Sequence, residues 1–246
     1  MHNLTPETRR RQALILTSLV GSFLPPFMLS AFNVALPTIA RELHLSALAT
    51  NWTTTGYLLV SSALVLPFGR LGDLYGRRRI YFQGILWFTV FSLLLIFAPS
   101  GGWMIGLRMG QGLGVAMIFG AGTALLMAMF PPAERGWALG INVAAVYAGL
   151  SLGPFLGGLI TAEWGWRALF VPAIPIGLLT LLMVRQWIPD DRPAQTPVPF
   201  DLAGAVLYAA ALFCLVPSTQ YVSLAIGKLL LVTGIVCGVG FLLRQQ

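Results

Sequence analysis

Several long stretches of the 246-residue sequence carry no charged side chain. They include residues 12–40, 80–107, 109–133 and 136–162. A helix rises about 1.5 Å per residue, so roughly 20 apolar residues cross the ~30 Å hydrocarbon core of a bilayer. Because water is absent at that depth, each segment must satisfy its own backbone hydrogen bonds. The apolar runs are continuous rather than alternating, which predicts helices rather than a barrel.

Composition extends this prediction to the whole chain. With 57% hydrophobic and 9% charged residues and a mean hydropathy of +0.81, a water-soluble fold is nearly excluded. We expect an all-α membrane protein in which residues 1–188 form six transmembrane helices, 189–200 form a cytoplasmic linker, and 201–246 form two further helices. The expected spans are roughly 13–36, 50–69, 80–98, 103–129, 136–160, 168–188, 201–217 and 225–243.

The basic residues follow a membrane topology. A net charge of +7 could suggest nucleic-acid binding, but most arginines fall in segments on one side of the predicted bilayer. Only Arg41, Arg167 and Lys228 lie on the other side. The positive-inside rule then places both ends of this eight-helix chain in the cytoplasm, and it accounts for the charge without nucleic acid. The same-side residues are Arg9, Arg10, Arg11, Arg70, Arg77, Arg78, Arg79, Arg135, Arg185, Arg192 and Arg244.

The stretch Ile188–Pro199 reads IPDDRPAQTPVP and is typical of a linker. Six predicted helices precede it and two follow. Many transporters consist of two six-helix halves with the substrate near the midplane between them. We therefore expect that a C-terminal six-helix half is missing from this sequence or is supplied by a second chain.

The segment between the second and third predicted helices combines glycines with charges. Its glycines allow a tight turn and close approach to neighbouring helix ends, and its acid and arginines can form a switchable network. A carboxylate here also suits the N-terminal end of an adjacent helix. The alternative is a basic anchor that only fixes topology. The candidate residues are Gly69, Gly72, Asp73, Gly76, Arg77 and Arg78.

The fourth predicted helix carries Arg108, Gln111 and Gly112 at membrane depth. Arg108 lies close enough to the outer edge to snorkel to the interface. The functional alternative is a buried arginine that faces the bundle interior, since a charge inside the membrane usually marks a site. Both interpretations remain open from the sequence.

The fifth predicted helix is marked by glycine and proline. Gly149, Gly153 and Gly157 recur every four residues and form one stripe. Small residues at this spacing let another helix approach closely and slide, as alternating access requires, although they are also compatible with ordinary tight packing. The candidate residues of this helix are Gly140, Gly149, Gly153, Pro154, Gly157 and Gly158.

Polar, aromatic and methionine side chains inside the predicted helices are candidates for lining a substrate cavity. Plain helix packing is the alternative for each of them, and Asn33 in particular either bonds a neighbouring helix or lines the cavity. The candidates are Met28, Asn33, Trp52, Tyr57, Gln83 and Asn142. Cys214 and Cys237 lie inside predicted helices, so we expect no metal site and no cofactor. A membrane enzyme would need a polar catalytic cluster, which the predicted helices lack.

Three of these motifs resemble those of a known family. The segment Gly69–Arg79 resembles the GxLaDrxGrr signature of the major facilitator superfamily. Arg108–Gly112 resembles its helix 4 motif, and the glycines of the fifth helix match the antiporter motif. The segments NVALPTIA, Trp164–Arg167 and Phe200–Asp201 are similar to the fourteen-span drug:proton antiporters, which have two extra helices between their halves.

The resemblance implies roles for the candidate residues. Asp73 and Arg77 would hold a conformational lock against the other half, Arg108 would take part in proton coupling, and the stripe from Gly149 to Gly158 would form a hinge-like contact with the other half. One departure matters, because Met28 stands where the family usually has an aspartate. All eight acids of the chain map to loops or predicted helix ends.

The resemblance therefore leads to an export hypothesis with open alternatives. The leading hypothesis is a transporter in a bacterial inner membrane that exports amphipathic or cationic drugs against protons by alternating access. Its partners would be the small-molecule substrate, protons, the bilayer and the missing half. A proton-independent facilitator, motivated by Met28, and an inactive fragment or half-transporter are the alternatives.

Overall fold

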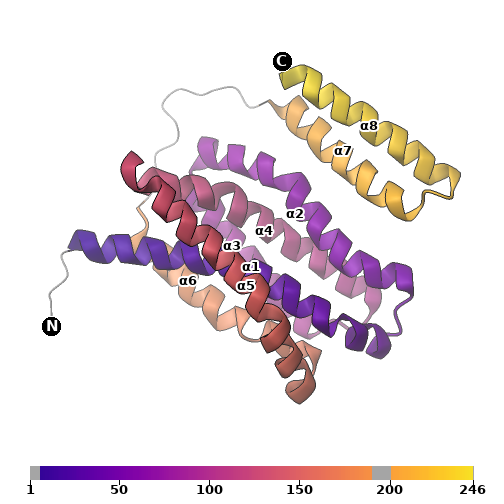
Figure 1. Cartoon of the computed structure of the whole chain (residues 1–246), viewed down its shortest axis with the longest axis horizontal. Coiled ribbons are helices and arrows are strands. Elements are labelled where there is room, and N and C mark those ends of the chain that lie inside the picture. Colours follow the sequence, from indigo (N-terminus) through magenta and orange to yellow (C-terminus); the bar gives the residue numbers. More distant parts are fainter. Residues whose placement is uncertain (1–5, 190–200, 246) are drawn as a thin grey trace.

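The computed structural model describes residues 6–189 and 201–245, and every regular element in these ranges is helical. Eight of the helices are long and apolar enough to cross a bilayer, which confirms the predicted fold class. Figure 1 shows their arrangement. The helices are α1 (Pro6–Glu42), α2 (Ala47–Tyr75), α3 (Arg77–Ile96), α4 (Gly101–Met129), α5 (Arg135–Trp164), α6 (Ala173–Trp187), α7 (Leu202–Gln220) and α8 (Ala225–Gln245). Short 3-10 turns at Pro132–Glu134 and Trp166–Phe170 precede α5 and α6.

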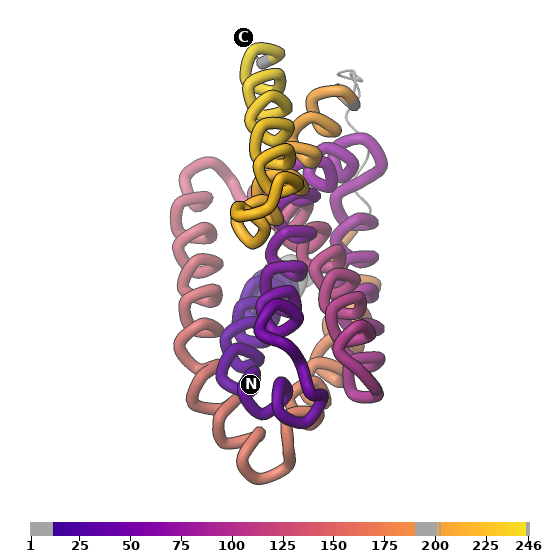
Figure 2. Tube along the Cα trace, turned by 90° about the vertical axis from the view of Figure 1, so that its right-hand side faces the viewer, coloured from indigo at the N-terminus to yellow at the C-terminus, as the bar shows by residue number. Residues whose placement is uncertain are grey.

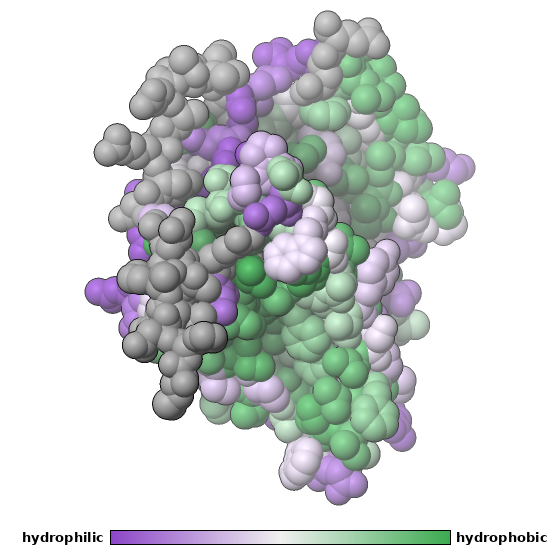
Figure 3. Space-filling model, turned by 60° about the vertical axis from the view of Figure 1, so that its left-hand side comes forward, coloured by the Kyte–Doolittle hydropathy of each residue, from purple (hydrophilic) through white to green (hydrophobic). Residues whose placement is uncertain are grey.

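The first six helices form one bundle. The most extensive contacts are those of α2 with α4, α1 with α5 and α3 with α4. One continuous core of buried side chains runs through the bundle and draws residues from α1, α2, α3, α4, α6 and the turn before α6, including Phe32, Tyr57, Phe88 and Phe170. From α5, the partly buried Leu156 and Ile160 pack against it. On the outside, large apolar side chains are exposed along the helices, and the face in Figure 3 carries broad hydrophobic areas. Such a surface suits contact with lipid.

Glycines on α4 set the distance to its two neighbours. A Cβ atom added at Gly112 would lie 2.5 Å from the carbonyl oxygen of Tyr57 on α2, and one added at Gly114 would lie 2.7 Å from the backbone nitrogen of Phe88 on α3. These separations are shorter than any side chain tolerates. Because lipid offers no hydrophobic drive between helices, such close backbone contact is a main source of helix association. Gly106 on the same helix has no atom within 4 Å of the added Cβ.

The segment between α2 and α3 differs from the expectation of a loop. Gly69 and Gly72 lie inside α2, which continues to Tyr75, and α3 begins at Arg77. Gly76 alone makes the turn, with a φ of 100° that side chains rarely adopt. Gly69 and Gly72 instead lie close to Gly120 and Ala121 on α4. The two glycines therefore serve helix packing rather than the turn itself.

A polar cluster fastens the opposite end of the bundle. The indole Nε1 of Trp166 donates to Glu42 Oε2 at 2.7 Å, and Arg167 forms an ion pair with the same carboxylate. The guanidinium of Arg167 also lies 4.1 Å from the ring centre of Trp166 and donates to the Ala98 carbonyl at 3.4 Å. The ends of α1 and α3 are thereby tied to the turn before α6.

The last two helices form a hairpin beside α2 (Figures 1 and 2). The Tyr208 hydroxyl donates to the Ser62 carbonyl of α2 at 3.1 Å. Within the hairpin, Asp201 accepts a bond from the Gly204 N–H at 2.9 Å and pairs with Arg244 at 2.7 Å. The predicted linker at 189–200 lies outside the described residues from position 190 onward, and so does Gln246.

Candidate functional site

A cavity of about 360 Å³ opens in the bundle at the middle of four helices. Its walls come from α1, α2, α4 and α5, at positions near the midpoint of each helix. Substrate sites of transporters lie near the bilayer midplane, so this depth matches a transport site. The lining residues are Pro25, Pro26, Leu29, Tyr57, Leu58, Ser61, Ser62, Val65, Val115, Phe119, Val146 and Leu150.

The lining is mostly apolar, with three hydroxyl-bearing side chains. The Tyr57 hydroxyl donates to the Pro25 carbonyl at 3.3 Å, and the Ser61 hydroxyl donates to the Leu58 carbonyl at 2.9 Å. Cavities that hold small organic molecules are commonly of this size and are apolar with a few polar groups. This arrangement can accommodate an apolar or amphipathic molecule but offers no carboxylate to it.

Behind the wall of the cavity lies Arg108, which has no solvent-exposed surface. Its guanidinium carbon is 4.0 Å from the ring centre of Tyr57 and 4.2 Å from that of Phe32. Such positions over aromatic faces stabilise a cation that has left water. The snorkelling interpretation of Arg108 is therefore wrong, and the side chain faces the bundle interior.

A short chain of hydrogen bonds extends from Arg108. Its Nη1 donates to Gln111 Oε1 at 2.5 Å, its Nε donates to the Thr53 carbonyl at 3.4 Å, and Gln111 Nε2 donates to Ser92 Oγ at 2.8 Å. Among the described residues, the Nη2 atom has no partner. Gly112, the third residue of the motif, holds α2 against α4. The motif thus joins α2, α3 and α4 around one buried cation.

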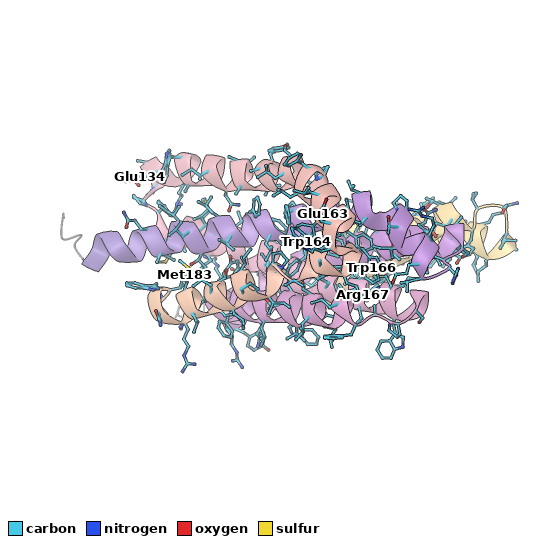
Figure 4. All side chains as sticks on the ribbon, turned by 90° about the horizontal axis from the view of Figure 1, so that it is seen from below. Glu134, Glu163, Trp164, Trp166, Arg167 and Met183 are labelled. Carbon is cyan, nitrogen blue, oxygen red and sulfur yellow. The ribbon has the colours of Figure 1, made fainter. Side chains whose placement is uncertain are left out.

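No described carboxylate lies near this cation. Glu42, Asp73, Glu134, Glu163 and Asp201 each lie at or within two residues of a helix end. Figure 4 shows Glu134 at one end of α5 and Glu163 at the other. Met28, at the position of the family aspartate, is packed in the apolar core with 1% of its surface exposed. Within the described chain, no group of three or more His, Cys, Asp or Glu side chains could hold a metal ion.

Of the six residues expected to bind substrate, only Tyr57 lines the cavity. Asn142 is buried and accepts hydrogen bonds from the hydroxyls of Ser18 and Ser22 on α1. Asn33 accepts a bond from Thr54 at 3.1 Å, which joins α1 to α2. Packing between helices thus accounts for both asparagines. Met28, Trp52 and Gln83 also lie outside the lining.

The glycine stripe of α5 faces α1 of the same bundle. A Cβ added at Gly149 would lie 2.5 Å from the Phe23 carbonyl oxygen, and one added at Gly157 would lie 2.6 Å from the Cα of Ala31. Gly153 is equally close to α1, whereas Gly140 has no neighbour within 4 Å of an added Cβ. Gly158 has only ordinary contact with Val34, and Pro154 is exposed. The expectation that this stripe contacts a second bundle therefore needs correction, because α1 already occupies it.

The charged residues at the α2–α3 turn form contacts within the chain. Arg77 Nε donates to Asp73 Oδ1 at 2.9 Å, and Arg77 Nη1 donates to the Ala124 carbonyl of α4 at 3.3 Å. Arg78 donates to the carbonyls of Val184 and Arg185 at the end of α6. This end of the bundle is thus cross-linked among α2, α3, α4 and α6.

Most of the cavity lining was absent from the sequence candidates. In the sequence, the missed residues look like ordinary residues of a lipid-facing helix. They line the cavity only because of the side of the helix on which they lie; examples are Ser61, Ser62, Val146 and Leu150. The adjacent serines Ser61 and Ser62 at the centre of the second span were the one signal available in the sequence.

The matches to known proteins agree with this architecture. Residues 18–203, more than half of the chain, match the family described as Major Facilitator Superfamily. The chain belongs to the Major Facilitator Superfamily. This major facilitator chain is also similar in fold to a bacterial homologue of the human lysosomal transporter Spinster, solved in an inward-facing and occupied conformation, with a TM-score of 0.62 at 18% identity. The similarity covers 93% of this chain and 57% of that structure.

Curated relatives of the major facilitator chain include export proteins. It is 32% identical to the multidrug efflux pump LfrA of Mycolicibacterium smegmatis, over 98% of this chain and 50% of LfrA. It is 35% identical to the tetracenomycin C resistance and export protein of Streptomyces glaucescens, over 74% of this chain and 34% of that protein. It is also 31% identical to the riboflavin transporter RibZ of Clostridioides difficile, over 82% of this chain and 44% of RibZ. The chain thus spans between about a third and a half of the length of these relatives.

Proposed function

We propose that this chain supplies the first bundle of an exporter of amphipathic or cationic small molecules in a bacterial inner membrane. In this proposal the exporter works by alternating access and proton antiport. Both ends of the chain face the cytoplasm, as the positive-inside rule favours. A second bundle, in the same polypeptide or in another, completes the pathway.

The observation that carries this proposal is the apolar cavity at mid-depth between α1, α2, α4 and α5. Its size suits a drug-sized molecule, and its lining selects for apolar surface. The names of LfrA and of the tetracenomycin C protein support export as the direction of transport. Since the cavity is open rather than enclosed by this chain, closure would fall to the second bundle.

Two substitutions of the same kind on α5 test the cavity. Leu150 lines it, whereas Leu152, with 45% of its surface exposed, points elsewhere on the same helix. The intact gene that contains this chain is expressed in a host without its main drug pumps, and accumulation of ethidium, a cationic amphipathic dye, is measured. Leu150→Trp fills the cavity and should raise accumulation toward that of cells without the gene, while Leu152→Trp should not. Equal behaviour of the two variants would contradict the assignment.

A second candidate function is a facilitator that moves its substrate without protons. It is favoured by Met28 in the apolar core and by carboxylates that lie only at helix ends. Proton antiport needs a titratable group that is reachable from both sides, and the described helices offer none at mid-depth. In the antiport proposal that group lies outside the described residues, and Arg108 acts on it through its charge.

Proteoliposomes separate the two functions. The purified intact gene product is reconstituted with a pH-sensitive dye inside the vesicles, and ethidium is added outside. Antiport predicts a pH change that depends on the drug, and the facilitator predicts drug movement without it. If the reading frame of the intact gene contains no further helices and no partner bundle is co-expressed, the chain is a fragment and neither function applies.

We extend the proposal to the charged turn between α2 and α3 as a conformational lock. Asp73 and Arg77 hold each other and the end of α4 in the described state. Movement of a second bundle against this end would exchange these contacts for others. Asp73→Asn should lower export severalfold, while the cost to stability should stay below about 1 kcal/mol because the pair is partly exposed. Unchanged export would exclude the lock.

A further inference from the structure

A second hollow of about 350 Å³ lies at the arginine-rich end of the bundle, away from the central cavity. It is lined by Arg78, Arg79 and Phe82 at the start of α3 and by Arg185 near the end of α6. Three arginines therefore line one small space. An anion that enters it would be attracted by the positive charges of Arg79 and Arg185, whose side chains are exposed.

Two hydrogen bonds of Arg78 join α3 to α6 at this hollow. Arg78 Nη2 donates to the Arg185 carbonyl at 3.0 Å and its Nε donates to the Val184 carbonyl at 3.3 Å. A cation at the carbonyl end of a helix is stabilised there by the helix dipole. Arg78 thus holds α3 and α6 together, while the side chains of Arg79 and Arg185 are exposed.

An apolar surface continues from the hollow along the same two helices. Leu86 and Val90 on α3 are each 41% exposed, and Leu178 and Leu182 on α6 are 52% and 55% exposed. Leu86 and Val90 follow Phe82 at four-residue steps on α3, and Leu178 and Leu182 precede Arg185 by about two turns and one turn on α6. Since α3 and α6 pack on each other, these side chains form an apolar surface on the membrane side of the hollow. Positive charge at the interface above an apolar surface is the pattern expected for a phospholipid, whose phosphate and acyl chains would contact the two parts. A soluble anion would use only the charges.

We propose that Arg79 and Arg185, beside Phe82, bind the phosphate headgroup of an anionic phospholipid. Basic pockets between transmembrane helices at the cytoplasmic surface are known to hold such headgroups. Arginine suits this ligand because its planar fork of donors matches the phosphate oxygens. The site does not depend on the proposed export function, since neither the central cavity nor a second bundle contributes to it.

The test is lipid binding by the purified intact gene product in a neutral detergent, followed by native mass spectrometry. Phosphatidylglycerol is titrated against phosphatidylcholine, which has the same chains but no net charge. The wild type should retain phosphatidylglycerol preferentially. The double variant Arg79→Gln/Arg185→Gln should lose roughly 30-fold in its affinity for phosphatidylglycerol, because each arginine near an anionic headgroup contributes a factor of about five.

A matched control removes two positive charges from the same end but outside the hollow. Arg70→Gln/Arg135→Gln has the same net charge as the test variant and should change the affinity by less than about threefold. Arg79→Lys/Arg185→Lys keeps the charge and should retain most of the binding. If the glutamine double variant does not fold, Arg185→Gln alone should still give a loss of about fivefold, because its backbone carbonyl continues to hold Arg78.

Several outcomes would overturn the proposal. If the wild type retained phosphatidylcholine as well as phosphatidylglycerol, the hollow would not select an anionic lipid. If the control pair lost as much affinity as the test pair, the general positive charge of the surface would explain the binding. Displacement of the lipid by an equal concentration of inorganic phosphate would make this a site for a soluble anion. If the variant Asp190→Asn/Asp191→Asn bound phosphatidylglycerol and the wild type did not, the acidic residues that follow α6 in the sequence, and not a lipid, would be the partners of these arginines.

Discussion

The six-helix bundle and the α7–α8 hairpin are both made of apolar helices, but they differ in how closely their helices pack. In an apolar 18-residue stretch of each helix, 56% of the residues of α1 and 50% of those of α4 are buried, against 17% in α7 and 11% in α8. Within the bundle, α2 with 22% and α5 with 17% are buried about as little as α7. Inside the bundle, glycines bring backbones into direct contact. In the hairpin, Gly234 of α8 is close to Leu215 of α7 and Gly227 is close to Tyr221 in the turn, and a hydrogen bond from Tyr208 reaches α2. Hydropathy therefore identifies a helix as membrane-spanning, while close packing determines which other helices it packs against.

The largest effect is expected at the α1–α5 contact. Gly149→Leu would force the backbone of α1 away, since even a Cβ at this position lies 2.5 Å from the Phe23 carbonyl oxygen. Overpacking of this kind should lower the free energy of unfolding by about 3 kcal/mol or more. Unfolding in mixed detergent micelles measures it. Gly140→Leu, on the same helix but with no neighbour within 4 Å, serves as the control and should be close to neutral.

A smaller effect is expected between α2 and α4. Gly112→Ala adds one methyl group 2.5 Å from the Tyr57 carbonyl and should cost about 2 kcal/mol of stability in the same unfolding assay. Gly106→Ala adds the same methyl group to open space and should be neutral or slightly stabilising, because alanine favours a helix. If both substitutions had the same effect, backbone contact would not distinguish the two positions.

The hairpin should respond locally and weakly. Tyr208→Phe removes the hydrogen bond to the Ser62 carbonyl and should cost about 1 kcal/mol at the contact of α7 with α2. Hydrogen exchange should then accelerate in α7 and stay unchanged in α1 and α4. Faster exchange throughout the bundle would show that the hairpin is an integral part of it.

The smallest effect concerns pH at the start of α7. The Gly204 N–H and the Arg244 guanidinium hold the pKa of Asp201 below its usual range. The folded state therefore gains stability that is complete above the ordinary aspartate pKa of about 3.9 and is lost as pH falls through the lower folded value. Exchange in the first turn of α7 should rise at acid pH in the wild type. In Asp201→Asn the rise should disappear, and its persistence would point to another group.

The sequence predicted the existence of the helices better than their partners. Long charge-free runs identify spans because the bilayer imposes length and apolarity on each helix separately. The side on which a residue lies depends on the packing of helices far apart in the chain. The stripe at Gly149 therefore predicted close contact but not α1 as the partner. Arg108 could have been buried or snorkelling, and the sequence near it does not reveal Phe32 and Tyr57 above and below its guanidinium.

The turn after α2 was misjudged for a related reason. Glycines and charges between two apolar runs are typical of a loop, yet Gly69 and Gly72 continue the helix because α4 lies close enough to require residues without side chains. Local composition predicted a tight turn and close approach to neighbouring helices, but not that Gly76 alone makes the turn while Gly69 and Gly72 make the close approach. The resemblance to a known family identified the motif, but its geometry came from the structure.

The ion pair between Glu42 and Arg167 has a consequence for how the protein is made. The two residues are 125 positions apart, so α1 enters the membrane long before Arg167 is synthesised. At a synthesis rate of about 5–20 residues per second, the ribosome needs roughly 6–25 s to supply Arg167 after Glu42. Until Arg167 is made, the carboxylate of Glu42 lacks its ion-pair partner. In the same way, the hydroxyls of Ser18 and Ser22 on α1 lack their acceptor until Asn142 is made. α1 is thus inserted well before α5 and the turn before α6 supply these contacts, and a nascent chain stalled before α5 would expose α1 to quality control.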